Sequence, residues 1–590
     1  MPEHDSVIAL LRERAARHGS REALVFSPDP ADAAADEPRT YAELDAVARG
    51  LGGHLAHRFD QGTRLLLPYA PGPAFAESFL ACLYAGMIAV PTPMPDGYQR
   101  QRERLVAIAR DAGAAGVLVD AENAEAVNLW TKDAGLELAV VVVDGAEALA
   151  AGPDAWREPA TDARTLAFLQ YTSGSTSLPK GVAIDHGNVL ANADIFARLT
   201  SSSEETRFGG WLPMYHDFGL IGLLLTPLVL GATTVLMSPA AFLKRPHMWL
   251  HLMDRQHINV SPAPNFAFDL CVQRITDEQI AGLDLSRWTQ ALNGSEPVRA
   301  TTLRAFAERF AGAGLRRTAL QPGYGMAETT LCVSCTPATR GALITPVDAA
   351  ELDANRFRPA APGTGPGLTR DLVSSGRPTR GLDVRIVDPR SRRELPEGEV
   401  GEIWVRGENV ARGYWQRPQE TAGQFGVATA EGAGGFLRTG DLGVLAEGDL
   451  YVTGRIKELI IVNGRNLYPH DLEATAREVH PALRRGVTAA FPVAVPQEEI
   501  AVVQECRAGQ LGVVSPAEIV AEIRHRISGE FQVAVGSVAL VRPGEVRRTS
   551  SGKIQRAHTG RLFTEGALKT VHEELSDGMR ATRRMAGRRG

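Results

Sequence analysis

Short apolar runs rich in valine, leucine and isoleucine recur along the chain and are separated by stretches with helical periodicity. The runs predict buried strands at residues 64–67, 116–119, 139–143, 233–237 and 258–260. Residues 74–85 and 301–310 have the spacing of amphipathic helices, and Thr40 with Glu43 forms a capping box that opens a helix running towards His57. Strands that alternate with helices in this way indicate an α/β protein with mostly parallel sheets.

One uncharged run, residues 219–237, is long enough to raise the question of a membrane span. Pro227, Gly231 and three threonines interrupt it. We therefore interpret the run as a buried helix, a turn and a buried strand, with a membrane span as the alternative. The N-terminus carries Glu3 and Asp5 and lacks a long apolar core, so no signal peptide is expected.

The composition is that of a globular protein with more than one core. A chain of 590 residues is too long for a single core, and its net charge of −6 gives no electrostatic footprint for nucleic acid. Five cysteines in so long a chain argue against a disulfide framework, so we expect a reducing, cytoplasmic location. Cys332 and Cys335 form a C-x-x-C motif, but no second pair completes a zinc site, and we interpret them as small apolar residues.

We expect a domain boundary near residue 455. Residues 1–455 contain most of the predicted strands. Residues 456–565 form a second domain, with its own strands at 501–503 and 538–541 and a helix at 516–527.

Two segments differ from their surroundings. Residues 337–369 are rich in alanine, proline and glycine and weak in periodicity, which indicates an insertion in the first domain. Residues 566–590 carry several arginines and little apolar content, which predicts a flexible tail. The tail is either a solvated end or a contact for an acidic partner.

Residues 171–181 (YTSGSTSLPKG) are the most informative segment for chemistry. They follow an apolar run at 166–169, which predicts a strand that ends in an exposed loop. Glycine lets the backbone approach a ligand, successive N–H groups can form an anion site, and Lys180 adds a positive charge. The segment therefore suits a polyphosphate, although its spacing is not that of a P-loop. A serine- and glycine-rich surface loop is the alternative.

Five further segments follow this loop in order. They are residues 213–217 (PMYHD), 293–297 (NGSEP), 323–329 (GYGMAET), 438–441 (RTGD) with 451–457 (YVTGRIK), and 549–553 (TSSGK). Together these motifs resemble the adenylate-forming superfamily of acyl-CoA synthetases, luciferases and peptide-synthetase adenylation domains, over residues 6–563. The resemblance implies a large N-terminal domain with two mostly parallel α/β sheets and a small β-barrel. A small, mobile C-terminal α+β domain would follow.

A narrower resemblance is to the fatty acyl-AMP ligases. It rests on His216 with Asp217, the 293–297 segment, 372–376 (LVSSG) and 464–469 (GRNLYP). In that branch an insertion precedes the LVS motif, as residues 337–369 do here, and is thought to prevent productive use of coenzyme A. The resemblance implies ATP and Mg²⁺ as cofactors and a fatty acid as substrate. The implied partner is an acyl carrier protein or a carrier domain of a polyketide or peptide synthase.

The resemblance also implies roles for single residues. Lys553 would lie between the substrate carboxylate and the α-phosphate, His216 near the acyl carboxylate, and Glu328 would hold Mg²⁺ as a third catalytic residue. Lys457 would be a hinge. The ATP- and AMP-binding set comprises Thr172, Ser173, Gly174, Ser175, Thr176, Lys180, Gly294, Ser295, Glu296, Tyr324, Gly325, Met326, Ala327, Asp441 and Arg455. Two residues depart from the superfamily pattern: Ala327 stands where many members have threonine, and Ser177 where they have glycine.

The implied reaction is attack of a carboxylate on the α-phosphorus of ATP, which needs charge neutralisation and positioning rather than a general base. Taken singly, each residue has a structural alternative. Asp441 is compatible with a turn, Glu328 with a first-turn helix acid, His216 with a structural pair to Asp217, and Lys553 with a solvated loop. Two alternative functions stay open, an acyl-CoA synthetase and a non-catalytic nucleotide-binding scaffold. A peptide-synthetase adenylation domain fits less well, because such domains usually place an aspartate before the pocket to hold the amino group, and the stretch around His216 and Asp217 does not look like that.

Overall fold

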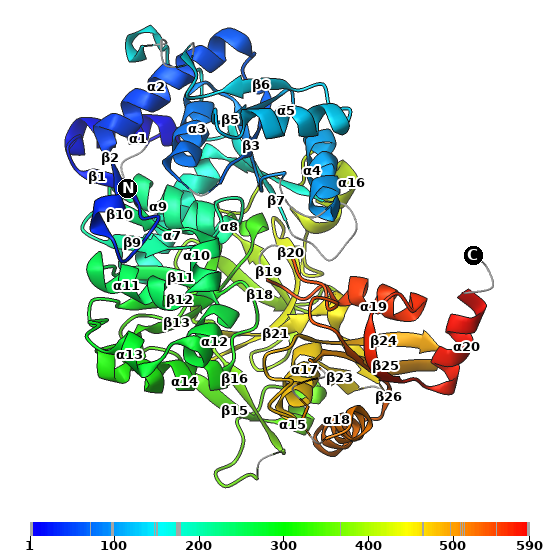
Figure 1. Cartoon of the computed structure of the whole chain (residues 1–590). Coiled ribbons are helices and arrows are strands. Elements are labelled where there is room, and N and C mark those ends of the chain that lie inside the picture. The colour runs from blue at the N-terminus through cyan, green and yellow to red at the C-terminus, as the bar shows by residue number, and fades with distance from the viewer. Residues whose placement is uncertain are drawn as a thin grey trace.

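The computed structural model describes residues 4–586 apart from residues 71, 96–98, 147, 149–151, 173–178, 366, 463–464, 496, 508, 510, 513 and 550–551. Figure 1 shows the C-terminal elements, coloured orange to red, packed to one side of a larger body formed by the rest of the chain. The helices of the larger body are α1 Val7–His18, α2 Tyr41–Arg58, α3 Pro73–Tyr84, α4 Gln99–Ala112, α5 Ala124–Asp133, α7 His186–Thr200, α8 Asp217–Gly219, α9 Thr226–Leu230, α10 Pro239–Lys244, α11 His247–Arg255, α12 Asn265–Arg274, α13 Asp277–Ile280, α14 Ala300–Phe310, α15 Ala349–Asp353 and α16 Pro418–Gln424.

Two mostly parallel sheets form the framework of the larger body. The first has the order β17-β14-β13-β12-β11-β9-β10-β1-β2, parallel from β13 to β1 and antiparallel at both ends. The second has the order β6-β5-β3-β4-β7-β8, in which only the β7–β8 pair is antiparallel. The strands are β1 Glu22–Phe26, β2 Glu37–Thr40, β3 Arg64–Pro68, β4 Ile88–Thr92, β5 Gly116–Val119, β6 Ala139–Val142, β7 Leu166–Tyr171, β8 Gly181–Asp185, β9 Arg207–Gly210, β10 Thr233–Leu236, β11 Val260–Pro264, β12 Gln290–Gly294, β13 Leu320–Gly325, β14 Cys332–Cys335 and β17 Arg377–Pro378.

The structure confirms the predicted α/β class, the capping box of α2 and most of the predicted strands. The strand predicted at 258–260 is largely wrong, because β11 begins at Val260 and continues to Pro264. Prolines 262 and 264 discourage a strand assignment, since proline cannot donate to a sheet ladder. They are tolerated because β11 pairs with β9 at Val260 alone, so most of that edge of β11 has no β9 partner.

The uncharged run forms α8, a π-helical turn at Leu220–Leu225, α9 and β10, and all its residues are buried. Gly231 ends α9 with φ of 80°, a conformation that favours glycine. The run is therefore a helix, a turn and a strand, as the sequence predicts. Among the described residues, no helix is both long enough and apolar enough to cross a membrane.

The region between the large sheets and the small domain is antiparallel. The strands β18 Asp383–Val387, β19 Gly401–Arg406, β20 Leu437–Ala446 and β21 Asp449–Arg455 form a sheet in this order. In the part of the chain that the structure describes, β18 and β21 do not pair with each other, so the expected small barrel is an open sheet. The predicted insertion contains β15 Ile344–Asp348 and α15, and β15 pairs with β16 Thr369–Val373.

The C-terminal elements have their own sheet, in the order β24-β25-β26-β27, and their own apolar core. They are β22 Ile460–Val462, β23 Arg465–Leu467, α17 Pro469–Glu478, β24 Thr488–Val495, β25 Gln497–Glu505, α18 Pro516–Phe531, β26 Val535–Val541, α19 Arg556–Glu565, β27 Thr570–Glu574 and α20 Asp577–Ala586. Strands and helices mix here, as expected for an α+β domain.

The expectation of a flexible tail at 566–590 needs correction up to residue 586. β27 adds to the edge of β26, and α20 packs back with Met579 fully buried. Arg583 lies 3.0 Å from Glu573 and donates to the backbone oxygen of Phe563 at 2.9 Å. The tail is ordered because Leu568 and Met579 join an apolar cluster with Phe563 of α19, and because Arg583 finds partners in α19 and β27. Low apolar content alone does not reveal these contacts.

Candidate active site

A cavity of about 1370 Å³ lies where the large body meets the C-terminal elements. It is lined by the ends of β7, β12, β13 and β21, by residues of β20, and by the segment before α19. Ligands of α/β proteins bind at the carboxyl ends of parallel strands, and three of these strand ends belong to the two large sheets. The cavity therefore brings together segments from residue 91 to residue 561.

Four described residues of the predicted phosphate loop line this cavity, Tyr171, Thr172, Pro179 and Lys180. Thr172 accepts a hydrogen bond from Arg104 of α4 at its backbone oxygen, at 2.7 Å. Lys180 forms an ion pair with Glu420 and lies 5.2 Å from the centroid of the Tyr414 ring. Ser173, Gly174, Ser175 and Thr176 lie outside the described residues.

Glu328 lies in the middle of the cavity wall, in the short 3₁₀ turn Ala327–Thr329 that follows β13. Its Oε1 accepts a hydrogen bond from the hydroxyl of Tyr414 at 2.8 Å, and burial raises the pKa of its carboxyl group. Among the described residues there is no group of three or more potential metal ligands. A single carboxylate fits Mg²⁺, which binds one or two carboxylates together with substrate phosphates.

Asp441 and Arg455 face each other across the β20–β21 pair. Arg455 Nε donates to Asp441 Oδ1 at 2.6 Å, and the Tyr324 hydroxyl donates to Asp441 Oδ2 at 2.8 Å. The Asp441 carboxylate raises the pKa of Arg455, so this guanidinium stays charged. The arrangement places a carboxylate, a cation and an aromatic ring side by side.

Glycine is required at Gly325, where an added Cβ would lie 1.7 Å from the backbone oxygen of Leu331. Gly325, Met326 and Ala327 all line the cavity. Ala327 leaves no hydroxyl at this position. The neighbouring Thr330 donates its hydroxyl to the backbone oxygen of Asn409 at 2.7 Å, so it does not replace the missing donor.

The 293–297 segment follows β12. Gly294 and Ser295 line the cavity, whereas Glu296 does not. Glu296 Oε1 accepts a hydrogen bond from the backbone N–H of Phe266, in the first turn of α12, at 2.5 Å. The structure therefore places Glu296 behind the cavity wall, where it ties α12 to β12.

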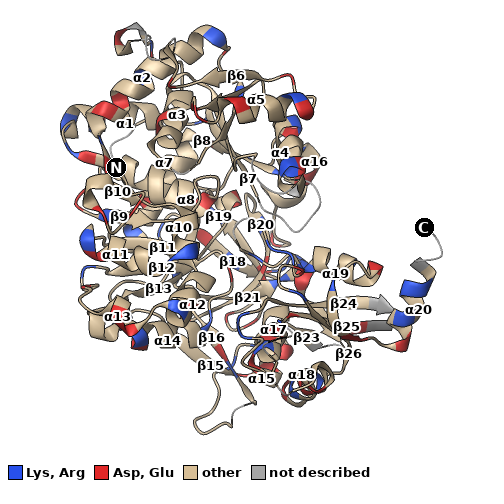
Figure 2. Ribbon diagram, viewed as in Figure 1, with Lys and Arg blue, Asp and Glu red and all other residues tan. Residues whose placement is uncertain are grey.

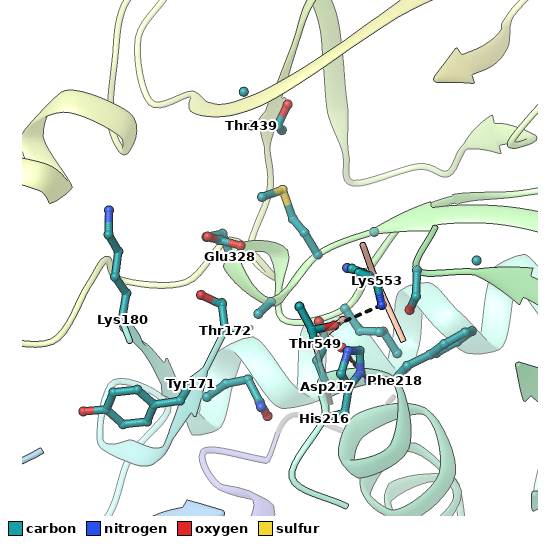
Figure 3. Close-up of a pocket in the computed structure, with 18 of the residues that line it drawn as sticks. Tyr171, Thr172, Lys180, His216, Asp217, Phe218, Glu328, Thr439, Thr549 and Lys553 are labelled. Atoms are coloured by element: carbon teal, nitrogen blue, oxygen red, sulfur yellow. Dashed lines mark hydrogen bonds and ion pairs between the residues drawn. The ribbon is translucent and has the colours of Figure 1, made fainter. Parts of the chain in front are cut away.

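His216 and Lys553 come together from different domains. His216 Nδ1 lies 2.7 Å from Asp217 Oδ1, and both line the cavity at the start of α8. Lys553 follows the loop that begins at Thr549, and its backbone N–H donates to the Thr549 hydroxyl at 3.0 Å. Figure 3 shows Lys553, Thr549, His216 and Asp217 gathered on one side, with Glu328 and Lys180 on the other.

Burial lowers the pKa of Lys553, and nearby Arg455 lowers it further. The carboxylates of Asp217, Asp441 and Glu296 act in the opposite direction. Three acids therefore favour the charged form of this buried lysine. Apolar residues complete the wall: Phe196, Leu199, Phe218, Leu292 and Leu331.

Three residues at or beside the cavity escape prediction from sequence: Arg104 and Tyr414, which line it, and Glu420, which pairs with Lys180. They belong to helices or loops without a chemical motif, and they meet the site only through the fold. The two cysteines at 332 and 335 also line the cavity. All five cysteines are free, and burial raises the pKa of the Cys335 thiol to about 12.

The chain matches the model of the AMP-binding enzyme family over residues 11–415. Residues 457–573 match the AMP domain of the Disco-interacting protein 2-like family. The first match covers more than half of the chain. The chain therefore belongs to the AMP-binding enzyme family.

Curated relatives align with more than nine-tenths of the chain. The medium-chain fatty acid–acyl-carrier-protein ligase JamA of Moorena producens is 39% identical over 572 residues, covering 96% of both proteins. The long-chain fatty acid–AMP ligase FadD26 of Mycobacterium marinum is 37% identical and covers 94% of this chain and 97% of its own. Among solved structures, the fatty acyl-adenylate ligases studied from E. coli and L. pneumophila include a chain 31% identical, with a TM-score of 0.85, covering 96% and 99%.

Proposed function

We propose that the protein is a fatty acyl-AMP ligase that activates a fatty acid with ATP and then transfers the acyl group to the phosphopantetheine thiol of an acyl carrier protein. One observation carries this proposal: Lys553 of the small domain enters a cavity that also contains Lys180, Glu328 and apolar side chains of the large body. Relatives named as ligases of fatty acids to AMP or to acyl carrier protein support the substrate class.

In the first half-reaction a carboxylate oxygen of the fatty acid forms a bond to the α-phosphorus of ATP. The bond from the α-phosphorus to the bridging oxygen breaks, and pyrophosphate leaves. The nucleophile is already an anion, so no residue has to remove a proton. Lys553 would lower the repulsion between the carboxylate and the α-phosphate, which requires a charged amine. The nearby Asp217 carboxylate raises the pKa of Lys553 and so favours this charged form.

The remaining residues would hold the nucleotide. We propose that Glu328 holds Mg²⁺, which neutralises charge on the phosphate oxygens when bound. Thr172 and Lys180 would bind the β- and γ-phosphates, together with residues 173–176. Asp441 and Arg455 would bind the ribose, Tyr324 would stack on adenine, and Gly294 with Ser295 would line its other side. His216 would lie beside the acyl carboxylate.

We further propose a boundary between residues 455 and 456, a hinge at Lys457 and a cytoplasmic location. The separate family matches over residues 11–415 and 457–573 support the boundary. Lys457 lies in the short 3₁₀ turn Ile456–Glu458 that connects the two regions. A hinge there would move the small domain between adenylation and acyl transfer.

The insertion supports transfer to a carrier protein rather than to coenzyme A. Val347, Leu352 and Phe357 are buried in one cluster with Tyr451 of the large body and Tyr468 of the small domain. Arg370, directly after the insertion, lies 2.9 Å from Asp353 and 5.2 Å from the ring centroid of Phe531. The insertion therefore touches both domains, and we propose that it restricts how the small domain approaches the adenylate.

The test is ATP–pyrophosphate exchange with a series of fatty acids of increasing chain length. We expect exchange that depends on the fatty acid, followed by acyl transfer to a holo carrier protein but not to the same protein without phosphopantetheine. Absence of exchange with every acid would instead favour a nucleotide-binding scaffold. Efficient acyl-CoA formation with free coenzyme A would favour an acyl-CoA synthetase.

A further inference from the structure

Lys180 is held by side chains that the proposed mechanism does not use. Its ammonium group is paired with Glu420 of α16 and also lies over the face of Tyr414. Lysine has a flexible four-carbon stem, so an ion pair and a cation–π contact on one ammonium group restrict its direction. About a quarter of the side chain, 27%, is exposed. Lys180 is thus directed along the cavity wall by contacts within the protein.

Tyr414 brings the lysine, the glutamate and the candidate metal ligand together. Two backbone hydrogen bonds, of 2.9 and 2.8 Å, join residues 413–415 to β8, so this short segment lies along the outer edge of the strand. Because Lys180 immediately precedes β8, this pairing sets the Tyr414 ring beside its side chain. The hydroxyl of the same tyrosine donates to Glu328 at 2.8 Å. One ring therefore contacts both Lys180 and Glu328.

Glu420 is fixed from the opposite side by Arg417. Arg417 lies 3.2 Å from Glu420 Oε1 and 2.6 Å from Asp111 Oδ1 of α4. The other oxygen of Asp111 accepts a hydrogen bond from Tyr171, the last residue of β7, at 2.7 Å. Figures 1 and 2 show α4 and α16 next to each other, with basic and acidic residues on α4 and the acidic Glu420 on α16. This network thus joins both ends of the phosphate loop, Tyr171 and Lys180.

We propose that Glu420 is a positioning residue that acts as an exchangeable counter-ion for Lys180. The β- and γ-phosphates displace it when ATP binds, and it takes the lysine back when pyrophosphate leaves. This inference rests on the proposed function. Pairing with Lys180 lowers the pKa of the Glu420 carboxyl, so it is charged at neutral pH and competes with the phosphates. It also repels them directly, since like charges at a half-exposed site interact measurably.

The test uses Glu420→Gln in the full chain. Glutamine keeps the shape and an oxygen that can accept from Arg417, but it loses the charge. We expect inorganic pyrophosphate, measured by calorimetry with Mg²⁺, to bind about three- to tenfold more tightly, because a competing ion pair of this kind is worth a small multiple of thermal energy. Inhibition of adenylate formation by pyrophosphate should strengthen by the same factor. The KM for ATP should fall without a rise in kcat.

The matched control is Glu103→Gln. Glu103 lies on α4 at the same cavity and accepts from Gln99 at 3.1 Å. The Glu103→Gln substitution removes one negative charge from the cavity and leaves the Lys180–Glu420 pair unchanged. We expect the affinity for pyrophosphate to change less than twofold. In a Lys180→Ala background, Glu420→Gln should tighten pyrophosphate binding less than it does in the unaltered protein, because only the direct repulsion by Glu420 is then removed.

Equal tightening in both glutamine variants, or weaker pyrophosphate binding in Glu420→Gln, would overturn the proposal. Weaker binding together with a lower melting temperature would mean that Glu420 only supports the fold of the loop. The proposed function fails separately, if the unaltered protein shows no ATP–pyrophosphate exchange. Normal exchange with unchanged pyrophosphate affinity in Glu420→Gln contradicts this inference alone.

Discussion

Burial acts in opposite directions on the two charged residues at the centre of the cavity. It raises the pKa of Glu328 and lowers the pKa of Lys553, in each case favouring the neutral form. The Tyr414 hydroxyl donates a hydrogen bond to Glu328, and the negative charge of Asp217 raises the pKa of Lys553. The charges needed for adenylate formation are therefore maintained by particular neighbours rather than by solvent.

Lys553→Ala should nearly abolish adenylate formation and leave ATP binding largely intact. The lysine would contact charge that develops between carboxylate and α-phosphate, and loss of one such contact costs about 10²–10³ in rate. The measurement is the burst of acyl-AMP in a quenched single turnover, beside equilibrium binding of ATP. Lys569→Ala, at an exposed lysine of the same domain, is the control. A near-normal burst in Lys553→Ala would remove the lysine from the reaction.

His186 predicts a pH dependence of stability. This histidine is 1% exposed at the start of α7, its Nδ1 accepts from the backbone N–H of Val7 at 3.3 Å, and burial lowers its pKa from 6.5 to about 4. Between pH 4 and pH 6.5 the unfolded chain binds more protons at this histidine than the folded protein does. The contribution of neutral His186 to the free energy of unfolding is therefore complete above pH 6.5, falls as pH falls, and is lost near pH 4, a change of about 3 kcal/mol.

The test is the urea midpoint of His186→Gln between pH 4 and pH 7.5. We expect a smaller slope with pH than in the unaltered protein, even if the variant is less stable throughout. His257→Gln changes an exposed histidine and should keep the original slope. The same slope in all three proteins would exclude His186 as a source of the acid instability.

At the scale of elements, the sequence predicts those helices and strands that have a clear apolar periodicity and a recognisable signal at one end. Residues 233–237 are recognised as a strand because an apolar run follows a glycine turn, and α2 because Thr40 and Glu43 cap it. Residues 261–264 and α20 are not recognised. The prolines of β11 are tolerated because β11 pairs with β9 at Val260 alone, and Met579 is buried because α20 packs against α19 and β24.

Lys457→Pro tests the hinge. Proline fixes φ and also restricts the residue before it, so the turn at 456–458 should lose freedom of rotation. We expect adenylate formation to survive. The rate of acyl transfer to the carrier protein should fall by a factor at least tenfold larger than any fall in the rate of adenylate formation. Lys457→Ala removes the side chain and leaves the backbone free, so both half-reactions should stay close to normal. Equal loss of both steps in Lys457→Pro would contradict a hinge at this position.

At the scale of the molecule, the site depends on contacts between segments that are far apart in the chain. The motif residues Thr172, Lys180, Glu328 and Lys553 were predictable, and they share one cavity. Asp441 was also predictable, and it is hydrogen-bonded to two residues of the cavity wall, Tyr324 and Arg455. Asp441 lies within 4 Å of groups from β13 and β21. Glu420 and Arg104 were not predictable, because their importance comes from the packing of α16 and α4 against the phosphate loop. Glu296 is the opposite case: it belongs to a predicted motif, but its carboxylate joins α12 to the end of β12 instead of lining the cavity.

Removal of residues 337–369 should leave acyl-AMP formation intact and raise acyl-CoA output from near zero. The segment bridges the domains: Asn355 accepts from Asn466 at 2.8 Å, and Arg370 beside it lies 3.8 Å from Asp471. Products are measured by chromatography with ATP, a long-chain fatty acid and coenzyme A. Arg370→Ala loosens the same junction without uncovering the apolar cluster and should give a smaller increase.

Two results would contradict this expectation. Efficient acyl-CoA formation by the intact protein would mean that coenzyme A is not excluded. A folded deletion variant that forms the adenylate but no acyl-CoA would mean that another part of the protein excludes it.

The position of β1 has a consequence for synthesis of the chain on the ribosome. β1 lies between β10 and β2, and Leu24 pairs with Thr234, roughly two hundred residues later. β1 and β2 can form a hairpin early, but its inner edge has no partner until β10 emerges. An unpaired apolar edge invites association with other chains. The nascent protein therefore carries an unprotected strand through more than a third of its translation, and a chaperone that shields short hydrophobic strands should raise its yield.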